Sequence, residues 1–91
     1  MTRYKSLKLI NQLFGMADAV VGDDFPRTLT KAEADKALQS RSRLLIRARL
    51  LAETFDHRNL RGKANRLLIA NAERRGSLKL KKGSATNADN V

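Results

Sequence analysis

The chain has 91 residues and no cysteine, and this absence removes several kinds of chemistry at once. Without a thiol, the protein can form no disulfide framework, no thiolate zinc site, no iron–sulfur cluster and no cysteine nucleophile. Tryptophan is also absent, and histidine and proline occur once each. The longest apolar runs, residues 44–46 and 67–70, are far shorter than a membrane span. The length allows one small domain and leaves no room for a separate cofactor domain.

Acidic residues are scarce, because 9 Asp+Glu stand against 19 Lys+Arg and give a net charge of +10. The excess is concentrated in residues 41–76, where nine arginines and Lys63 face only three acidic residues. Arginine presents a planar fork of five donors that fits phosphate and carboxylate oxygens. We therefore expect a nucleic-acid partner, DNA or structured RNA, contacted mainly through its phosphate backbone. The alternatives are an acidic protein partner and a basic surface that only maintains solubility.

The predicted nucleic-acid footprint consists of cations from Arg43 onward. Its main members are Arg43, Arg47, Arg49, Arg58, Arg61, Lys63, Arg66, Arg74 and Arg75. Three further lysines near the end of the chain add affinity without sequence preference: Lys79, Lys81 and Lys82. Only four residues are aromatic, which disfavours recognition of single strands by base stacking.

Apolar residues recur at helical spacing along most of the chain. The predicted fold class is all-α, a small three-helix bundle with a disordered basic C-terminal tail. The helical domain covers residues 1–76 and the tail covers residues 77–91, where small and polar residues dominate. The predicted helices span about residues 4–21, 31–56 and 60–75.

Short sequence signals mark two of the helix ends. Thr30, followed three residues later by Glu33, predicts a capping box at the start of the second helix. Gly76 predicts a C-cap at the end of the third helix. Arg74 and Arg75, just before it, suit the negative end of the helix dipole.

The second helix is apolar on two sides, which indicates a rival function. Arg41 falls within its main apolar stripe, where the charged head must snorkel to solvent or find a partner. Ile46 and Leu50 lie on the opposite side, and Ile69 takes an outer position on the third helix. The rival is a protein-interaction module (an adaptor, virion component or inhibitor) that docks on an acidic partner through these three residues. A homodimer or a larger protein assembly would cover the same surfaces.

No pattern in the sequence supports catalysis. His57 lies in a polar break beside Asp56 and Arg58, and we interpret it as a surface or capping residue rather than a general base. The patterns of phosphate-binding loops, zincins and EF-hands do not occur. We therefore expect no enzyme activity, no cofactor and no small-molecule substrate.

Carboxylates and N-terminal cations each allow one further interpretation. The pair Asp23–Asp24, and Glu33 near Asp35, are the only candidates for a bound Mg²⁺, but turn and cap roles explain them more simply, so no metal site is expected. Residues 1–17 are basic and amphipathic, as in a membrane-surface helix or a transit peptide, but a core helix is favoured because the later helices need a packing partner. We expect a cytoplasmic protein that is not membrane-bound, with association to a nucleoid, ribosome or virion left open.

A helix-turn-helix arrangement is a last alternative for the second and third helices. It would place Lys63, Asn65, Arg66 and Ile69 at base edges in the major groove. Arg58 stands four residues before Gly62, where such units carry a small residue so that the helices can approach. A looser grip on the phosphate backbone is therefore the favoured interpretation.

Overall fold

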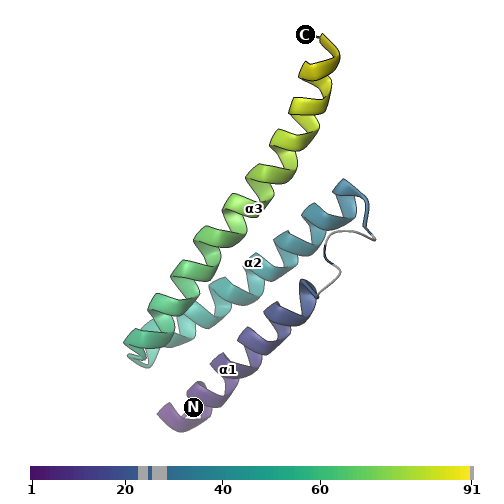
Figure 1. Cartoon of the computed structure of the whole chain (residues 1–91). Helices are drawn as coiled ribbons and strands as arrows, with labels where there is room; N and C mark the ends of the chain where they lie inside the picture. Colours follow the sequence, from purple (N-terminus) through teal and green to yellow (C-terminus); the bar gives the residue numbers. More distant parts are fainter. Residues whose placement is uncertain (23–24, 26–28, 91) are drawn as a thin grey trace.

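A computed structural model describes residues 1–22, 25 and 29–90 of the chain, with side chains described up to Leu78. Over these residues the protein folds into three helices, α1 (Arg3–Val20), α2 (Lys31–Thr54) and α3 (Arg58–Asn90), and contains no strand. The middle helix α2 packs against both α1 and α3 (Figure 1). The predicted fold class, an all-α small bundle, is confirmed.

The first two helices begin at side-chain caps, as their sequences dictate. The Thr2 hydroxyl accepts a hydrogen bond from the backbone N–H of Lys5 at the start of α1. At the start of α2, the Thr30 hydroxyl accepts from the Glu33 N–H, and the Glu33 carboxylate accepts from the Thr30 N–H. This is the predicted capping box, which satisfies two backbone donors that the helix itself leaves unpaired.

The turn between α2 and α3 is shorter than the polar break that the sequence suggests. Asp56 adopts the left-handed conformation, with φ of 56°, which Asp tolerates better than most side chains. His57 follows directly; its N–H donates to the Ala52 carbonyl, and its own carbonyl accepts from the Arg61 N–H. The backbone of His57 therefore makes both the last hydrogen bond to α2 and the first hydrogen bond of α3.

The two helices joined by this turn run antiparallel. Arg49 of α2 donates to Asn65 of α3, and Arg75 of α3 donates to Asp35 of α2, so residue numbers fall along one helix as they rise along the other. Figure 1 shows α2 and α3 as a hairpin. A helix-turn-helix unit requires helices that cross at about 90–120°, so that interpretation is wrong for this chain.

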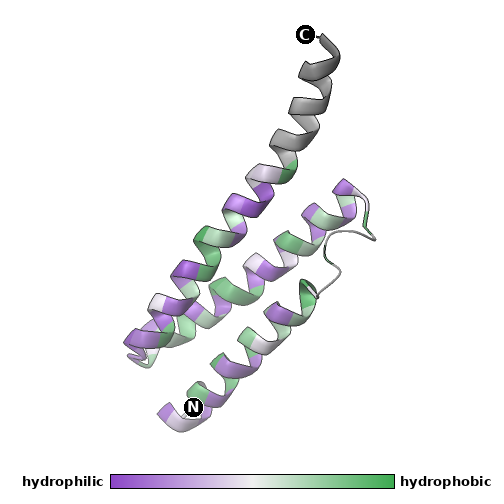
Figure 2. Cartoon of the chain, viewed as in Figure 1, coloured by the Kyte–Doolittle hydropathy of each residue, from purple (hydrophilic) through white to green (hydrophobic). Residues whose placement is uncertain are grey.

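The core lies where the three helices meet. Leucine, isoleucine and phenylalanine side chains of α1 pack against small alanines of α2 and α3, which let the helices approach closely. The buried core comprises Ile10, Leu13, Phe14, Ala17, Leu45, Ala48, Ala52 and Ala64. Figure 2 shows hydrophobic residues distributed along α1 and α2, whereas the first part of α3 is mostly hydrophilic.

A buried polar network links all three helices beside this core. Arg41 of α2 is only 6% exposed. Its Nε donates to the Ala17 carbonyl and its Nη1 donates to Asn71 Oδ1, each at a distance of 3.2 Å. Asn71 of α3 is fully buried, and its amide donates to the Leu38 carbonyl at 2.8 Å and to Ser42 Oγ at 2.6 Å. The Ala17 carbonyl lies in the last turn of α1, where helices lack internal donors, so Arg41 caps α1 from a neighbouring helix.

Burial also acts on the charge of Arg41. Desolvation lowers the pKa of its guanidinium, while the Asp18 carboxylate, 3.9 Å from Nη2, opposes this effect. A guanidinium stays protonated in proteins, so Arg41 remains a cation that the network must satisfy. The side chain pairs internally, which is one of the two outcomes that the sequence allows.

The third helix is longer than its sequence predicts. Gly76 lies inside α3 and not at a C-cap, no glycine has a positive φ over the described residues, and the helical backbone continues to Asn90. The predicted end at residue 75 and the predicted cap are therefore wrong. The last turns of α3 extend beyond the ends of the other two helices (Figure 1). The disorder expected for residues 77–91 stays a prediction.

Candidate functional site

The structure places the predicted footprint cations in three different environments. In the first, arginines are engaged along the α2–α3 hairpin. Arg75 forms an ion pair with Asp35 at 2.9 Å, and Arg49 donates to Asn65 at 3.4 Å. Arg58 is exposed and lies 3.6 Å from the Asp56 carboxylate at the turn. The Asp35–Arg75 pair is half-buried and contributes to packing of the hairpin.

In the second environment, cations lie over aromatic rings. The Nζ of Lys63 is 4.7 Å from the centre of the Phe14 ring of α1. The guanidinium of Arg74 is 5.3 Å from the centre of the Phe25 ring. Both distances are within the range of cation–π attraction. Lys63 therefore faces α1, and Arg74 faces the connection between α1 and α2.

The third group consists of four exposed arginines that form no hydrogen bond or ion pair within the described part of the chain: Arg43, Arg47, Arg61 and Arg66. We call them the unpaired arginines. At 100° per residue, Arg43 and Arg47 lie one turn apart on the side of α2 that points away from the core. Arg66 points away from the core on α3, and Arg61 lies on its flank toward α2. The side chains of Lys79, Lys81 and Lys82 lie outside the description.

Carboxylates on these two helices are mostly engaged elsewhere. Glu33 accepts hydrogen bonds in its capping box, and bonds to the Thr30 backbone and hydroxyl lower the pKa of its carboxyl. Asp35 and Asp56 lie against arginines. Glu53 and Glu73 are the other two acidic residues between positions 31 and 78, and both are exposed. The outward surface of α2 and α3 is therefore positive.

The residues of the rival hypothesis are exposed, as the sequence suggests. Ile46, Leu50 and Ile69 have exposed fractions of 47%, 60% and 62%. Leu50 lines a groove between α1 and α2. Ile46 and Ile69 lie one turn from the Arg49–Asn65 contact, on the outer side of the hairpin. The three residues therefore form two surfaces rather than one.

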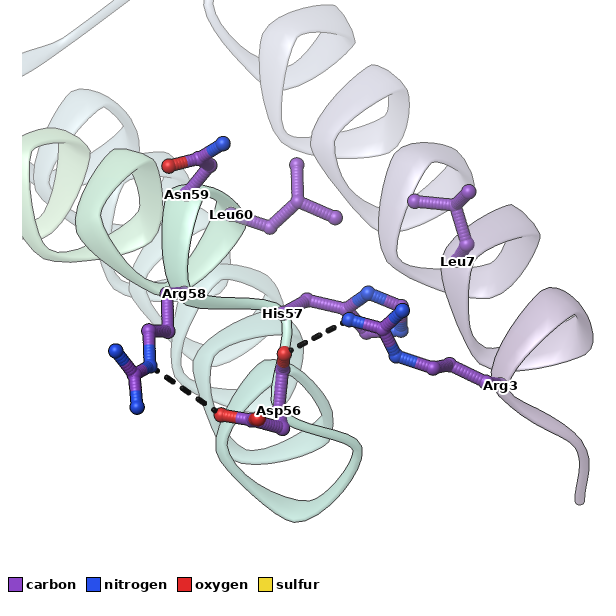
Figure 3. Close-up of a pocket in the computed structure, with 7 residues that line it drawn as sticks. All are labelled: Arg3, Leu7, Asp56, His57, Arg58, Asn59 and Leu60. Carbon is purple, nitrogen blue, oxygen red and sulfur yellow. Dashed lines mark hydrogen bonds and ion pairs between the residues drawn. The ribbon is translucent and has the colours of Figure 1, made fainter.

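A pocket of about 600 Å³ lies where the N-terminal end of α1 meets the α2–α3 turn (Figure 3). The Nε of Arg3 donates to the Phe55 carbonyl at 3.2 Å, and its Nη2 donates to the Asp56 carbonyl at 3.0 Å. In Figure 3 the Arg3 side chain reaches across from α1 toward the α2–α3 turn. Arg3 therefore caps the end of α2, as Arg41 caps the end of α1.

A serine–histidine contact behind this pocket was not predicted. His57 is 9% exposed, and its Nε2 lies 2.9 Å from Ser6 Oγ. The Ser6 hydroxyl donates to the Arg3 carbonyl at 2.6 Å, so the imidazole Nε2–H donates to Ser6. A serine nucleophile has to donate its hydroxyl proton to the histidine that acts as its base. Here the Ser6 hydroxyl donates to the Arg3 carbonyl instead. The contact connects α1 to the turn. Of the two predicted roles of His57, the surface position is wrong, whereas its position directly before α3 fits the capping role.

One sequence feature could have indicated this contact. Ser6 lies four residues before Ile10, so a polar side chain occupies the apolar face of the predicted first helix. A buried hydroxyl requires a polar partner. The partner is 51 residues away, and helical spacing alone does not identify it.

The described residues contain no group of three or more His, Asp or Glu side chains that could hold a metal ion. The Asp23–Asp24 pair lies outside the described residues. None of the described helices combines the length and the apolarity that a membrane crossing requires. No family model matches the chain, and no match was found among curated proteins or solved structures.

Proposed function

We propose that this protein binds nucleic acid without catalysing a reaction, and that it contacts the phosphate backbone of DNA or structured RNA through arginines of α2 and α3. The observation that carries the proposal is that four arginines of α2 and α3 are exposed and form no hydrogen bond or ion pair within the described residues. These are the unpaired arginines: Arg43, Arg47, Arg61 and Arg66. Contact with a phosphate would therefore displace only bound water and would break no existing ion pair. Each phosphate that they neutralise releases condensed counterions, which favours binding.

The other footprint cations have supporting roles in this proposal. Arg58 is exposed and would exchange the Asp56 carboxylate for a phosphate at little cost, because surface ion pairs are weak. Arg75 and Arg49 hold the hairpin together, and Lys63 and Arg74 cover aromatic rings. We expect these four cations to add less to affinity. Lys79, Lys81 and Lys82 extend the same charge along the chain end.

The aromatic residues support backbone contact over base stacking. Phe14 is buried in the core, and Phe25 and Phe55 are half-buried. Tyr4 is exposed, but it lies on α1, away from the unpaired arginines. Single-strand binding relies on several exposed rings that stack on bases. The described surface therefore suits a duplex or a folded RNA.

The test compares two charge-reversal pairs by fluorescence anisotropy with labelled duplex DNA, single-stranded DNA and an RNA hairpin. Arg61→Glu with Arg66→Glu removes two unpaired arginines of α3. Lys5→Glu with Lys8→Glu makes the same change on α1. Each reversal alters the charge by two, so both pairs lower the net charge from +10 to about +6.

We expect the α3 pair to weaken binding of the preferred nucleic acid by at least about tenfold, and the α1 pair to weaken it by a few-fold at most. Circular dichroism would confirm that both variants stay helical. Equal losses of affinity in the two variants would show that only net charge matters. A loss of affinity confined to the α1 variant would show that the interface lies on α1 and not on α3. The preferred probe distinguishes DNA from RNA.

Protein docking is a second candidate function, and a separate observation favours it. Three large aliphatic side chains, Ile46, Leu50 and Ile69, are about half exposed or more. Exposed apolar surface often marks an interaction site when it is contiguous, and here Leu50 lies on one surface and Ile46 and Ile69 on another. A homodimer or a larger assembly remains part of this candidate.

A further inference from the structure

The seam between α1 and α2 contains an apolar groove whose leucines have no role in the nucleic-acid proposal. The groove has a volume of about 430 Å³. Leu9 and Leu13 of α1 line one side, and Leu50 and Leu51 of α2 line the other. Met1 and Arg47 complete the lining, so five of the six lining residues are apolar and none is acidic.

The groove is a solvent-facing surface in the isolated chain. Leu50 and Met1 are exposed at its rim, Leu9 and Leu51 are half-buried, and Leu13 is buried at its base; Met16, outside the lining, is about half exposed. Met16 lies seven residues, or two turns, after Leu9 on the same side of α1, so it extends the apolar strip along the seam. An exposed strip between two antiparallel helices has the shape that accepts a further helix by its apolar face.

The charge beside the groove identifies the kind of helix that fits. Arg47 lines it, and Arg43 lies one turn further along the same side of α2; neither has a partner within the described residues. On the α1 side, Lys5 lies one turn before Leu9. A helix seated on the leucines would therefore have cations along its edges, and carboxylates on its flanks would pair with them.

We infer that the α1–α2 groove is a docking site for an acidic amphipathic helix of another protein. The leucines take its apolar face, and Arg47 and Arg43 take its carboxylates. A second copy of this chain fits less well, because a symmetric dimer would bring each Arg47 close to its own copy in a chain of net charge +10. Nucleic acid would leave the leucines uncovered. The inference shares Arg43 and Arg47 with the nucleic-acid proposal, but it depends on the leucines of the groove, whereas the nucleic-acid test changes Arg61 and Arg66 of α3.

The test uses a fluorescein-labelled synthetic helix of about 18 residues, or five turns, with Leu at every third or fourth position and Glu elsewhere. A scrambled peptide of the same composition has no apolar face and serves as the peptide control. The protein variants are Leu50→Glu and Arg47→Glu, with Ile69→Glu as a matched control. Leu50 and Ile69 are exposed to the same degree, but Ile69 lies on α3, away from the groove.

We expect the full-length protein to bind the amphipathic peptide at least about tenfold more tightly than the scrambled one. Leu50→Glu should weaken binding by at least about tenfold and Arg47→Glu by about threefold or more, while Ile69→Glu leaves it unchanged. Circular dichroism would verify the fold of each variant.

Three outcomes would overturn the inference. One is equal affinity for the two peptides, and another is an equal loss in Leu50→Glu and Ile69→Glu. The third is a dimer of the protein alone that Leu50→Glu dissociates, because a second copy would then occupy the groove. A nucleic-acid affinity that persists in Leu50→Glu would leave the nucleic-acid proposal standing, so the two proposals fail separately.

Discussion

The pair Arg41 and Asn71 should contribute a large share of the stability of this small bundle. Asn71→Ala removes three buried hydrogen bonds: two that its amide donates, to Leu38 and Ser42, and one that it accepts from Arg41. At about 1 kcal/mol each, their loss lowers the free energy of unfolding by about 3 kcal/mol. A core of this size supplies only about 3–5 kcal/mol in total, so the variant should be close to unfolding at room temperature.

Arg41→Met should cost a similar amount for a related reason. It leaves Asn71 Oδ1 and the Ala17 carbonyl without their donor, and an unsatisfied buried polar group costs about 1–3 kcal/mol. Replacing both partners removes the mismatch, so Arg41→Met combined with Asn71→Leu should cost about 1–2 kcal/mol less than the sum of the single changes. Urea unfolding followed by circular dichroism measures each free energy. Strictly additive costs, or single costs below about 1 kcal/mol, would refute this account of the network.

Two further predictions concern a glycine inside α3 and the cap at the start of α2. Gly76→Ala should raise the melting temperature, by a gain of up to about 1 kcal/mol, because Gly76 lies inside α3 and an added Cβ meets no atom within 4 Å; a lower melting temperature would indicate a C-cap instead. The lowered pKa of Glu33 means that its cap stabilises the fold above the ordinary carboxyl value of 4.5 and loses this effect as the pH falls below it. The difference in melting temperature between the protein and Glu33→Gln should therefore shrink between about pH 5 and pH 3, whereas a constant difference would contradict the charge-based cap.

Local sequence signals predicted the parts of the fold that depend on neighbours in the chain. The capping box of Thr30 and Glu33 acts over three residues, and it begins α2 where the sequence indicates. Helical spacing predicts a first helix over about residues 4–21, and α1 spans Arg3–Val20. These features follow from backbone geometry alone, so they do not require knowledge of the packed structure.

Features that depend on distant residues were not predictable in the same way. Arg75 finds Asp35 across 40 residues, and Arg3 reaches the Phe55 carbonyl across 52. The sequence treats the arginines from Arg43 to Arg75 as one footprint, because spacing does not reveal which guanidinium meets a carboxylate, a ring or a side-chain amide on another helix. The structure separates these roles and leaves the four unpaired arginines as the candidates for phosphate contact.

The end of α3 differs from the predicted end at residue 75 because a glycine has two common uses in helices. Glycine is a frequent C-cap because it tolerates a positive φ, but the same residue also occurs inside helices at a cost of about 1 kcal/mol relative to alanine. Gly76 lies inside the helix, and the adjacent Arg75 holds this part of α3 against α2 through its contact with Asp35. Composition alone cannot separate these two uses.

The most direct test of the proposed function is the salt dependence of binding to the preferred nucleic acid, measured by anisotropy from about 50 to 200 mM salt. If the four unpaired arginines each neutralise one phosphate, the logarithm of the binding constant should fall with the logarithm of the salt concentration with a slope of about −4 for duplex DNA. The slope should fall to about −2 in the variant that carries Arg61→Glu and Arg66→Glu. A slope near zero in the unmodified protein, or the same slope in both proteins, would contradict phosphate contact by these arginines.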